Sequence, residues 1–438
     1  MIKAVLPLSA IIALRFLGLF IVLPVLSVYA LQLDGANEIL VGVTIGGYAI
    51  TQMLLQVPFG TLSDKIGRKI TIAIGLVIFI IGSLICAWAT DIYTLMLGRF
   101  IQGSGAIGAV GTAMISDMVK EEVRARAMAL MGGSIAASFA LSMLVGPLIG
   151  GYFGADKLFL ITAALSVFAL ILLYTKVPNP PKISHSYGAD ETQIRHIFKD
   201  KDLMKMNVTN MLQKGMMTLA FLVIPILMLK DFGWEKKELW MVYLPAMIFG
   251  VIAMGPSAVL GEKKHKAKEM LMVGVVLFAT SYLIMGYSHS VPWFTVGVVL
   301  FFIGFNVHEP LMQSMASKYA KVHQKGAALG VFNSFGYIGT FFGGVLGGIL
   351  LKHYGIMQIA WVIFIICTFW LFLIGSLRHP GINKNIYLSF DEIDQKRAEN
   401  LHDVKGIVEW YRNESERILI VKYDSEVTNA ETVLAVLK

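Results

Sequence analysis

The sequence predicts an all-α polytopic membrane protein, with twelve transmembrane helices in two six-helix halves, followed by a small α+β domain. Three observations lead to this fold class. Hydrophobic residues make up 56% of the 438 residues and charged residues 15%, whereas soluble domains carry about 25% charge. Twelve apolar runs are long enough to cross a bilayer as helices, for which about 20 residues suffice. From residue 385 onward the chain is polar and contains no spanning run.

The apolar runs divide the chain into four parts. Residues 1–177 are expected to form an N-terminal six-helix bundle, 178–204 a cytoplasmic central loop, 205–378 a C-terminal six-helix bundle and 385–438 a soluble domain. The first run is too long for a cleaved signal peptide. The expected transmembrane spans are 5–31, 39–62, 70–89, 93–116, 126–152, 157–177, 205–230, 238–261, 269–287, 292–315, 325–351 and 356–378.

The cations in the loops indicate the orientation of the chain in the membrane. Loops on one face hold most of the lysines and arginines, among them Lys65, Arg68 and Lys69, and loops on the other face hold few. Cytoplasmic loops carry an excess of these residues, and an even number of helices returns the chain to its starting side. We therefore expect both termini in the cytoplasm of a bacterium, with the helices in its cytoplasmic (inner) membrane. The net charge of +8 reflects this asymmetry and does not indicate nucleic-acid binding.

A short charged stretch between the second and third runs is the most informative motif. It reads Gly60-Thr-Leu-Ser-Asp64-Lys-Ile-Gly67-Arg68-Lys69 and is expected to form a hairpin. Positive-inside bias alone would explain its cations, so a loop that only sets the topology is the simpler interpretation. Its spelling, however, resembles the signature loop that follows the second membrane helix in the major facilitator superfamily. Gly60 and Gly67 would then permit close backbone approach and a tight turn.

Two further motifs resemble the same family. The fourth run contains Arg99-Phe-Ile-Gln102-Gly103, which is similar to the R-x-x-Q-G motif of the family. The fifth run contains Gly146-Pro147-x-x-Gly150-Gly151, which is similar to the motif of its drug:proton antiporter branch. The resemblance extends over residues 1 to about 378. It implies the major facilitator fold, in which two bundles rock around a central cavity lined by helices 1, 4, 7 and 10.

The resemblance also implies a role for the charged stretch, that of a conformational latch at the cytoplasmic side. Asp64 would face the start of helix 11 near Lys325, and Arg68 would contact Asp117 at the end of helix 4. A carboxylate at a helix N-terminus contributes about 0.3–1 kcal/mol when exposed. A degenerate copy follows the eighth run, where Glu262 stands in the place of Asp64 but the glycines are lost. The expected latch residues are Gly60, Asp64, Gly67, Arg68, Lys69 and Asp117.

Polar residues inside the apolar runs are the candidate cavity residues. Charged groups within a membrane are expensive and face a cavity or a partner. Stripes of polar residues with helical spacing occur in the seventh and tenth runs. The alternative is interhelical hydrogen bonding, which contributes about 0.6 kcal/mol per pair. The candidates are Arg15, Gln52, Arg99, Gln102, Asn210, Lys214, Asn306, His308, Glu309 and Gln313.

Among these residues, Glu309 is the expected proton-responsive group, with Arg15 as its electrostatic counterpart across the cavity. Burial and a nearby cation act in opposite directions on the pKa of a carboxylate, which can leave it titratable as a cavity changes between wet and dry. His308 competes for this role, because the unperturbed pKa of histidine is about 6.5. Asp64 and Asp117 are further candidates, but they lie at the expected cytoplasmic surface.

The polar tail predicts a small folded domain. Residues 386–390, 406–411 and 417–423 are expected to be strands, and 391–401 and 426–437 helices. This β-α-β-β-α order is a ferredoxin-like pattern without its last strand, similar to the metal-binding module of copper chaperones and metal-exporting ATPases. No Cys-x-x-Cys is present, and Cu(I) requires soft thiolate ligands. Binding of a small ligand, or self-association, is therefore favoured over metal binding.

The sequence thus predicts a secondary active transporter that exports a drug or metabolite by alternating access, driven by protons. A proton-coupled importer of a small solute, and a membrane-embedded ligand sensor whose output is the C-terminal domain, remain as alternatives. An enzyme is not expected, and the lack of a G-x-x-x-x-G-K-[ST] loop argues against an ATP-driven pump. The expected partners are a small-molecule substrate, protons and the lipid bilayer, with no nucleic acid, cofactor or metal.

We predict that reporters fused at Lys438 will show a cytoplasmic C-terminus, because the cation-rich loops place it there. A fluorescent protein that folds only in the cytoplasm should be bright in this position, and alkaline phosphatase should be inactive. Phosphatase activity without fluorescence would contradict the orientation.

Overall fold

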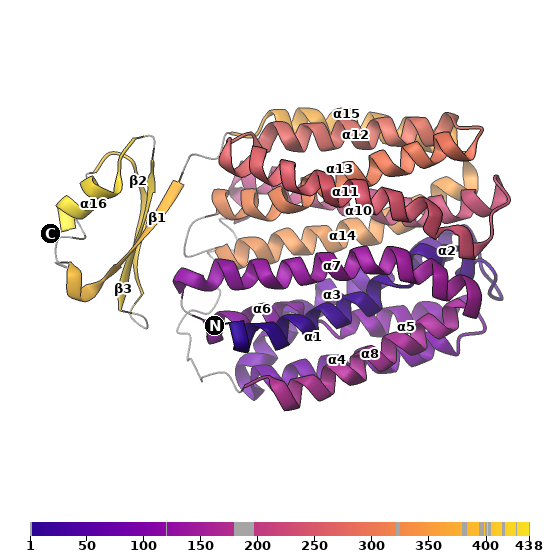
Figure 1. The fold of residues 1–438 in the computed structure, drawn as a ribbon, viewed down its shortest axis with the longest axis horizontal. Helices are drawn as coiled ribbons and strands as arrows, with labels where there is room; N and C mark the ends of the chain where they lie inside the picture. Colours follow the sequence, from indigo (N-terminus) through magenta and orange to yellow (C-terminus); the bar gives the residue numbers. More distant parts are fainter. Residues whose placement is uncertain are drawn as a thin grey trace.

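Long helices that run side by side make up most of the chain, and a small sheet lies beyond one end of them (Figure 1). The computed structural model describes residues 2–119, 121–178, 197–320, 325–378, 383–393, 398, 401, 404–413, 417–425 and 427–437. Within these residues, eleven helices are long and apolar enough to cross a membrane. The predicted polytopic helical fold is therefore confirmed.

The N-terminal half contains six spans, two of which are broken. Residues 21 and 22 interrupt the first span just before Pro24, whose ring cannot be accommodated inside a continuous helix without a kink. The helices are α1 (Ile2–Phe20), α2 (Leu23–Ala30), α3 (Glu38–Ile66), α4 (Arg68–Ala87), α5 (Ile92–Ser104), α6 (Ile107–Met118), α7 (Glu121–Phe153) and α8 (Ala155–Lys176).

The C-terminal half contains six spans that are each one long helix. Helix α11 (Trp240–Ala258) continues into a π-helical turn over Val259–Lys263. The helices are α10 (Lys201–Lys230), α11 (Trp240–Ala258), α12 (Ala267–Tyr287), α13 (Val291–Tyr319), α14 (Lys325–His353) and α15 (Ile356–Gly375). Helix α10 begins inside the predicted central loop, of which residues 179–196 lie outside the described part of the chain.

The twelfth membrane span is the pair α5 and α6, which the sequence predicted as one helix over 93–116. The prediction of a continuous helix is wrong, because the helix stops at Ser104 and restarts at Ile107. Glycine and serine are poor helix formers, and Gly103, Ser104 and Gly105 lie together here. The two pieces have 13 and 12 residues, so neither is long enough to cross alone.

The predicted hairpin over residues 60–69 is also wrong in its conformation. Helix α3 continues to Ile66 and α4 begins at Arg68, so Gly67 alone lies between them. Gly67 has φ +100°, a backbone conformation that is open to glycine and strained for other residues. A Cβ on Gly60 would meet no atom within 4 Å, so the expected close approach at Gly60 is not made in this structure.

The two halves repeat a contact between equivalent helices. Lys69, the second residue of α4, donates to the Val177 carbonyl oxygen at 2.9 Å, just after α8 ends. Lys268, the second residue of α12, donates to the Leu377 carbonyl oxygen at 2.9 Å, just after α15 ends. A cation at a helix C-terminus satisfies free carbonyl groups. Because the two lysines are 199 positions apart, this contact marks an internal repeat of the two halves, as the degenerate copy of the charged stretch at Glu262 does.

The halves meet closely through α3 and α14. A Cβ on Gly46 would lie 2.8 Å from the Thr340 carbonyl oxygen, and one on Gly348 would lie 2.8 Å from Ile39 Cα. Between these points a Cβ on Gly344 would overlap the Gly42 carbonyl oxygen. Small residues let helix backbones approach in membranes, and here they close one end of the space between the halves.

The same helix α14 uses a second row of glycines toward its own half. Gly339 packs on the Met211 carbonyl of α10, and Gly343 packs on the backbone of Gly215. A Cβ on Gly347, four residues further on, would lie 2.7 Å from Leu219 Cδ1. In each pair of adjacent glycines in α14, the first glycine therefore packs on α10 and the second packs on α3.

The other end of the α3–α14 pair is open. Cβ atoms built on Gly60 in α3, and on Gly326 and Gly330 in α14, would meet nothing within 4 Å. In α7, Gly132 and Gly133 are equally free of neighbours, whereas Gly151 at the far end packs on the backbone of Lys237. The halves are therefore in contact at the Gly42 end and apart at the Gly60 end, where the cation-rich connections lie.

The C-terminal domain contains a three-stranded antiparallel sheet of β1 (Asn383–Ser389), β2 (Ile407–Asn413) and β3 (Ile418–Asp424), and the helix α16 (Ala430–Leu437). The strand order is β1-β3-β2, with β3 antiparallel to both neighbours. A ferredoxin-like split βαβ unit gives this order. The helix predicted over 391–401 lies mostly outside the described residues, which show a 3-10 turn over Phe390–Glu392.

We predict that Gly344→Ala lowers the stability of the purified protein by about 1–3 kcal/mol, because the new Cβ overlaps the Gly42 carbonyl and over-packed sites cost this much. Gly330→Ala on the same helix is the matched control. It should raise stability by about 0.5–1 kcal/mol, because alanine favours helix and the site is open. Unfolding in mixed detergent micelles measures both, and equal effects would contradict the backbone contact.

Candidate functional site

An ion pair between α10 and α13 lies inside the C-terminal half. Lys214 Nζ is 2.5 Å from Glu309 Oε1, and Gln213 Nε2 donates to the same oxygen at 3.1 Å. The pair is only partly buried, since the relative exposure of the side chain is 27% for Lys214 and 34% for Glu309. The ammonium group also lies 5.0 Å from the centroid of the Phe305 ring, where cation–π attraction acts. Glu309 is therefore a partly accessible carboxylate with one charged partner, Lys214.

The other residues of the predicted α13 stripe have different surroundings. Gln313, about one turn after Glu309, is exposed. Asn306 is buried and donates from Nδ2 to the Phe302 carbonyl oxygen of its own helix at 2.9 Å. It faces α11, where a Cβ on Gly250 would lie 2.6 Å from that amide nitrogen. Asn306 therefore contacts a neighbouring helix and does not join the ion pair.

His308 faces away from Glu309, into the interior of its own half. Its side chain is fully buried, and Nε2 lies 2.8 Å from the Leu271 carbonyl oxygen of α12. The rings of Phe278 and Trp370 lie edge-on, at centroid distances of 5.5 and 5.4 Å. Successive residues of a helix point about 100° apart, which separates His308 from the side of α13 that carries Glu309.

Arg15 lies in α1 and forms a bridge toward the opposite half. Its Nη2 donates to Gln52 Oε1 at 3.1 Å, and Gln52 Nε2 donates to the Tyr337 hydroxyl of α14 at 2.6 Å. The guanidinium is fully buried and lies 5.4 and 5.1 Å from the ring centroids of Phe16 and Phe79. Aromatic rings therefore stabilise this cation, and the amide of Gln52 connects it to the other half.

Arg99 is a second buried cation of the N-terminal half. Its Nη1 donates to Gln102 Oε1 at 2.7 Å, and Gln102 Nε2 donates to Ser83 Oγ of α4 at 2.8 Å. The guanidinium lies 4.8 Å from the ring centroid of Tyr48 in α3. The R-x-x-Q-G motif thus ties α5 to α3 and α4 just before the helix breaks at Gly105.

Asn210 also connects two helices. Its Nδ2 donates to the Phe332 carbonyl oxygen of α14 at 2.7 Å, beside Gly336. The contact lies within the C-terminal half, near the open part of α14. Asn210 therefore makes the interhelical hydrogen bond that was the alternative to a cavity role.

The structure joins Glu309 to Lys214, and Arg15 to Gln52. Among the described residues, no hydrogen bond or ion pair links Arg15 to Glu309. Sequence reasoning missed Gln213 and Tyr337, although Gln213 is adjacent to Lys214. Spacing of three and four residues identifies positions on one face of a helix, so this criterion did not select Gln213, which is next to Lys214. Tyr337 is an isolated tyrosine in an apolar run and gives no sequence signal.

The charged stretch after α3 surrounds Arg68. Its Nε is 3.0 Å from Asp117 Oδ2, and its Nη1 is 2.5 Å from both Asp64 Oδ1 and Ser63 Oγ. The Arg68 and Asp117 side chains keep only 12% and 7% of their exposure, whereas Asp64 keeps 61%. Arg68 thereby holds the ends of α3, α4 and α6 together. The sequence predicts a contact of Asp64 with the start of helix 11, and residues 321–324, which lead into that helix, lie outside the described residues.

The degenerate copy in the second half keeps a charge pair with different partners. Glu262 Oε2 is 2.6 Å from Lys318 Nζ, and Glu262 Oε1 accepts from Ser314 Oγ at 2.6 Å. Both partners lie near the end of α13. The acidic residue after the eighth span therefore ties that span to α13, as Arg68 and Asp117 tie α4 to α6.

The Gly146-Pro147-x-x-Gly150-Gly151 motif packs α7 against three neighbours. Gly146 lies on the Ile21 carbonyl, at the break between α1 and α2. A Cβ on Gly150 would lie 2.8 Å from Leu158 Cδ1 of α8, and one on Gly151 would lie 2.5 Å from the backbone nitrogen of Lys237 in the opposite half. The motif thus contributes to the closed end of the space between the halves.

Two helical halves that touch at one end and hold an ion pair between their long apolar helices are the architecture expected of a secondary transporter. Over the described residues, no group of three His, Cys, Asp or Glu side chains forms a metal site. The sequence profile of the Major Facilitator Superfamily matches residues 8–268 and, in a second match, 215–387. The chain therefore belongs to this superfamily, whose members are transporters and not enzymes.

Curated relatives agree with this family. The inner membrane transport protein YajR of Escherichia coli K12 is 34% identical over 431 residues, which cover 96% of this chain and 94% of the relative. The quinolone resistance protein NorA of Staphylococcus aureus is 27% identical over 354 residues, or 77% of this chain and 87% of the relative.

Solved structures agree at the level of the fold. A bacterial homologue of the human lysosomal transporter Spinster, in an inward-facing and unoccupied conformation, matches with a TM-score of 0.69 and 14% identity, over 85% of this chain and 97% of that one. The nucleoside transporter NupG matches with a TM-score of 0.68 and 17% identity, over 85% and 98%. At such identities the likeness shows the fold alone.

We predict that Asp117→Asn destabilises the protein far more than Asp64→Asn. Removing one partner of a buried ion pair costs about 3–5 kcal/mol, because the other charge stays buried. An exposed pair contributes at most about 1 kcal/mol, and Asp64 is the exposed partner of Arg68. Unfolding in mixed micelles compares the two variants, and a larger loss for Asp64→Asn would contradict this arrangement.

Proposed function

We propose that this transporter is a proton-coupled exporter of a small molecule, with Glu309 as the proton-binding group. The observation that supports this most is the contact of Glu309 with Lys214, 2.5 Å apart between α10 and α13 and still partly exposed. An ionisable residue within a membrane domain marks a substrate or ion pathway by default. This pair combines an acid, a counter-charge and partial exposure of both side chains.

The charge balance of the pair provides a mechanism for exchange. With Glu309 ionised, its charge cancels that of Lys214. When Glu309 takes up a proton, Lys214 remains as an unpaired cation and Glu309 no longer offers an anion. A proton and a substrate that needs this carboxylate as a counter-charge or acceptor therefore compete for one site. Such competition allows an inward proton to be exchanged for an outward substrate.

The energy available from protons is sufficient to drive this exchange. One charge that crosses 100 mV supplies about 2.3 kcal/mol, and each pH unit of gradient adds about 1.4 kcal/mol. Export is supported by relatives named for resistance, such as NorA and the tetracycline resistance proteins. The relative YajR, an inner membrane protein by its name, supports the same membrane for this chain.

The cluster around Arg68 is proposed as the latch at the cytoplasmic end. Arg68 links the ends of three helices of the N-terminal half, so a shift of α3 would be passed to α4 and α6. Exposed Asp64 is free to turn from Arg68 toward the opposite half when the open end closes. Gly67 supports this role, because it is the single residue between α3 and α4 and its backbone conformation sets the angle between these helices.

Arg15 is proposed as part of the contact between the halves, in place of the expected pairing with Glu309. It orients the amide of Gln52, which in turn donates to Tyr337 on α14. This bridge lies beside the glycine contact of α3 and α14. Breaking it is therefore part of the change to a state that is open at the other end.

We predict that Glu309→Gln abolishes proton-driven transport, because the amide cannot bind or release the proton. Inverted membrane vesicles provide the assay, in which tetracycline or norfloxacin is added to vesicles that hold a pH gradient. Transport by the unaltered protein should dissipate the gradient, and Glu309→Gln should not. Glu262→Gln is the matched control, since Glu262 also pairs with a lysine, at the end of α13, and should keep transport.

A second measurement does not depend on the choice of substrate. Infrared difference spectra of the purified protein over a pH titration should contain a protonated-carboxyl band that is lost in Glu309→Gln and kept in Glu262→Gln. If Glu309→Gln retains both this band and gradient-driven transport, the proton site lies elsewhere.

A further inference from the structure

The C-terminal domain contacts the membrane helices through a lysine in its central strand. Lys422 keeps only 5% of its exposure, and its Nζ donates to the carbonyl oxygens of Lys318 at 3.2 Å and of Ala320 at 3.3 Å. These carbonyls end α13, the helix that carries Glu309. The last carbonyls of a helix have no partner within it, and a cation there is favourable both as a donor and toward the helix dipole.

The geometry of the sheet explains why Lys422 faces the helices. Leu419, Val421 and Tyr423 of β3 pack with the buried face of α16. Side chains alternate along a strand, so Lys422 lies on the opposite face together with Ile420, which is 1% exposed. Figure 1 shows α16 on the side of the sheet that is turned away from the membrane helices. The open face of the sheet is therefore its docking face.

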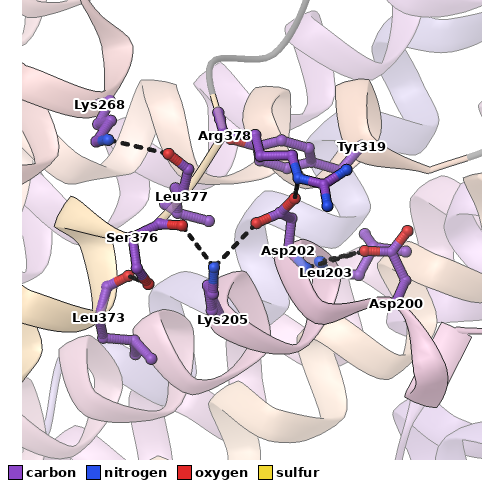
Figure 2. Close-up of polar contacts among 10 residues, drawn as sticks. All are labelled: Asp200, Asp202, Leu203, Lys205, Lys268, Tyr319, Leu373, Ser376, Leu377 and Arg378. Carbon is purple, nitrogen blue, oxygen red and sulfur yellow. Dashed lines mark hydrogen bonds and ion pairs between the residues drawn. The ribbon is translucent and has the colours of Figure 1, made fainter.

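The domain has little freedom to leave this position. Three side chains donate to the carbonyl oxygens that follow α15: Lys205 to Ser376, Lys268 to Leu377 and Tyr319 to Arg378 (Figure 2). Arg378 also lies 3.7 Å from Asp202 at the start of α10. Four residues connect this fixed point to β1, and an extended chain spans at most about 18 Å from residue 378 to residue 383. The domain is thus held at the open end of the helices even when undocked.

The docking site borders the part of the structure that must close. Ala320 lies five residues before the start of α14, and the first turns of α14, at Gly326 and Gly330, are apart from α3. In alternating access, the closed contact of α3 and α14 opens and their free ends come together. A sheet docked at the corner between α13 and α14 therefore occupies space next to the approaching end of α3.

We propose that the C-terminal domain is an internal wedge, which docks on the end of α13 through Lys422 and holds the transporter open at the cation-rich end. Through this contact the domain is bound to the C-terminal half, so it moves with that half and opposes closure sterically. A ligand shifts a two-state equilibrium only if it binds one state more tightly than the other. The docked sheet acts as such a ligand, because it fits the open state better than the closed state. Release of Lys422 would permit closure and faster turnover.

The experiment measures the separation of α3 and α14 at the open end. Nitroxide labels are placed at Thr61→Cys and Gly330→Cys, in a full-length chain in which the buried Cys86 and Cys367 are replaced by alanine. Pulsed electron resonance in nanodiscs, without substrate, gives the distance distribution. Lys422→Ala should increase the short-distance population several-fold. Lys384→Ala, which removes an exposed lysine of β1, should leave it unchanged.

A second variant tests the wedge without relying on one side chain. A chain that ends at Arg378 should shift toward the short distance at least as far as Lys422→Ala does. Unchanged distributions in both variants would overturn the wedge, and a shift in the shortened chain alone would overturn the role of Lys422. Because no proton gradient or substrate is used, these outcomes are independent of whether Glu309 is the proton site.

Discussion

The contact of α3 with α14 is the constraint on which the arrangement of the two halves depends. Helix α14 touches two helices at backbone distance, because one row of its glycines faces α10 and the next row faces α3. A larger residue in place of a glycine in either row would push α14 away from the helix that this row contacts. The first row makes α14 a fixed part of its own half, so α14 moves as one body with α10. The second row then becomes the surface on which the halves part, and the Gln52–Tyr337 hydrogen bond lies next to it.

Charged residues inside the two halves differ in their burial. In the N-terminal half, Arg15 and Arg99 are fully buried, and rings and amides surround them. Such cations keep their charge and serve as fixed supports for Gln52 and Gln102. In the C-terminal half, Lys214 and Glu309 remain partly exposed and can exchange partners. On the proposed function, a half whose buried charges are fixed would work against a half that carries a titratable pair.

The sequence predicted the helical membrane fold and the positions of most spans, because length and hydropathy are local properties. It could not predict the break at Gly105 or the helical path through residues 60–66, since both depend on packing between helices. The partner of Glu309 is a further example. Spacing shows that Lys214 and Glu309 each lie on a polar stripe, but only the rotation of α10 and α13 about their axes decides that these two meet. The same rotation turns His308 away, although it is adjacent in sequence.

The glycine contact of α3 and α14 has a consequence for how the transporter responds to its surroundings. A joint between two backbones contains no titratable group and no net charge, so neither external pH nor membrane potential acts on it directly. Its attraction is dispersion, which loses a quarter to a half of its strength over a gap of about 0.5–1 Å. Such a joint is either shut or parted, with little between. Its sharpness comes from the missing side chains, and on the proposed function ionisable groups elsewhere in the molecule would determine when it parts.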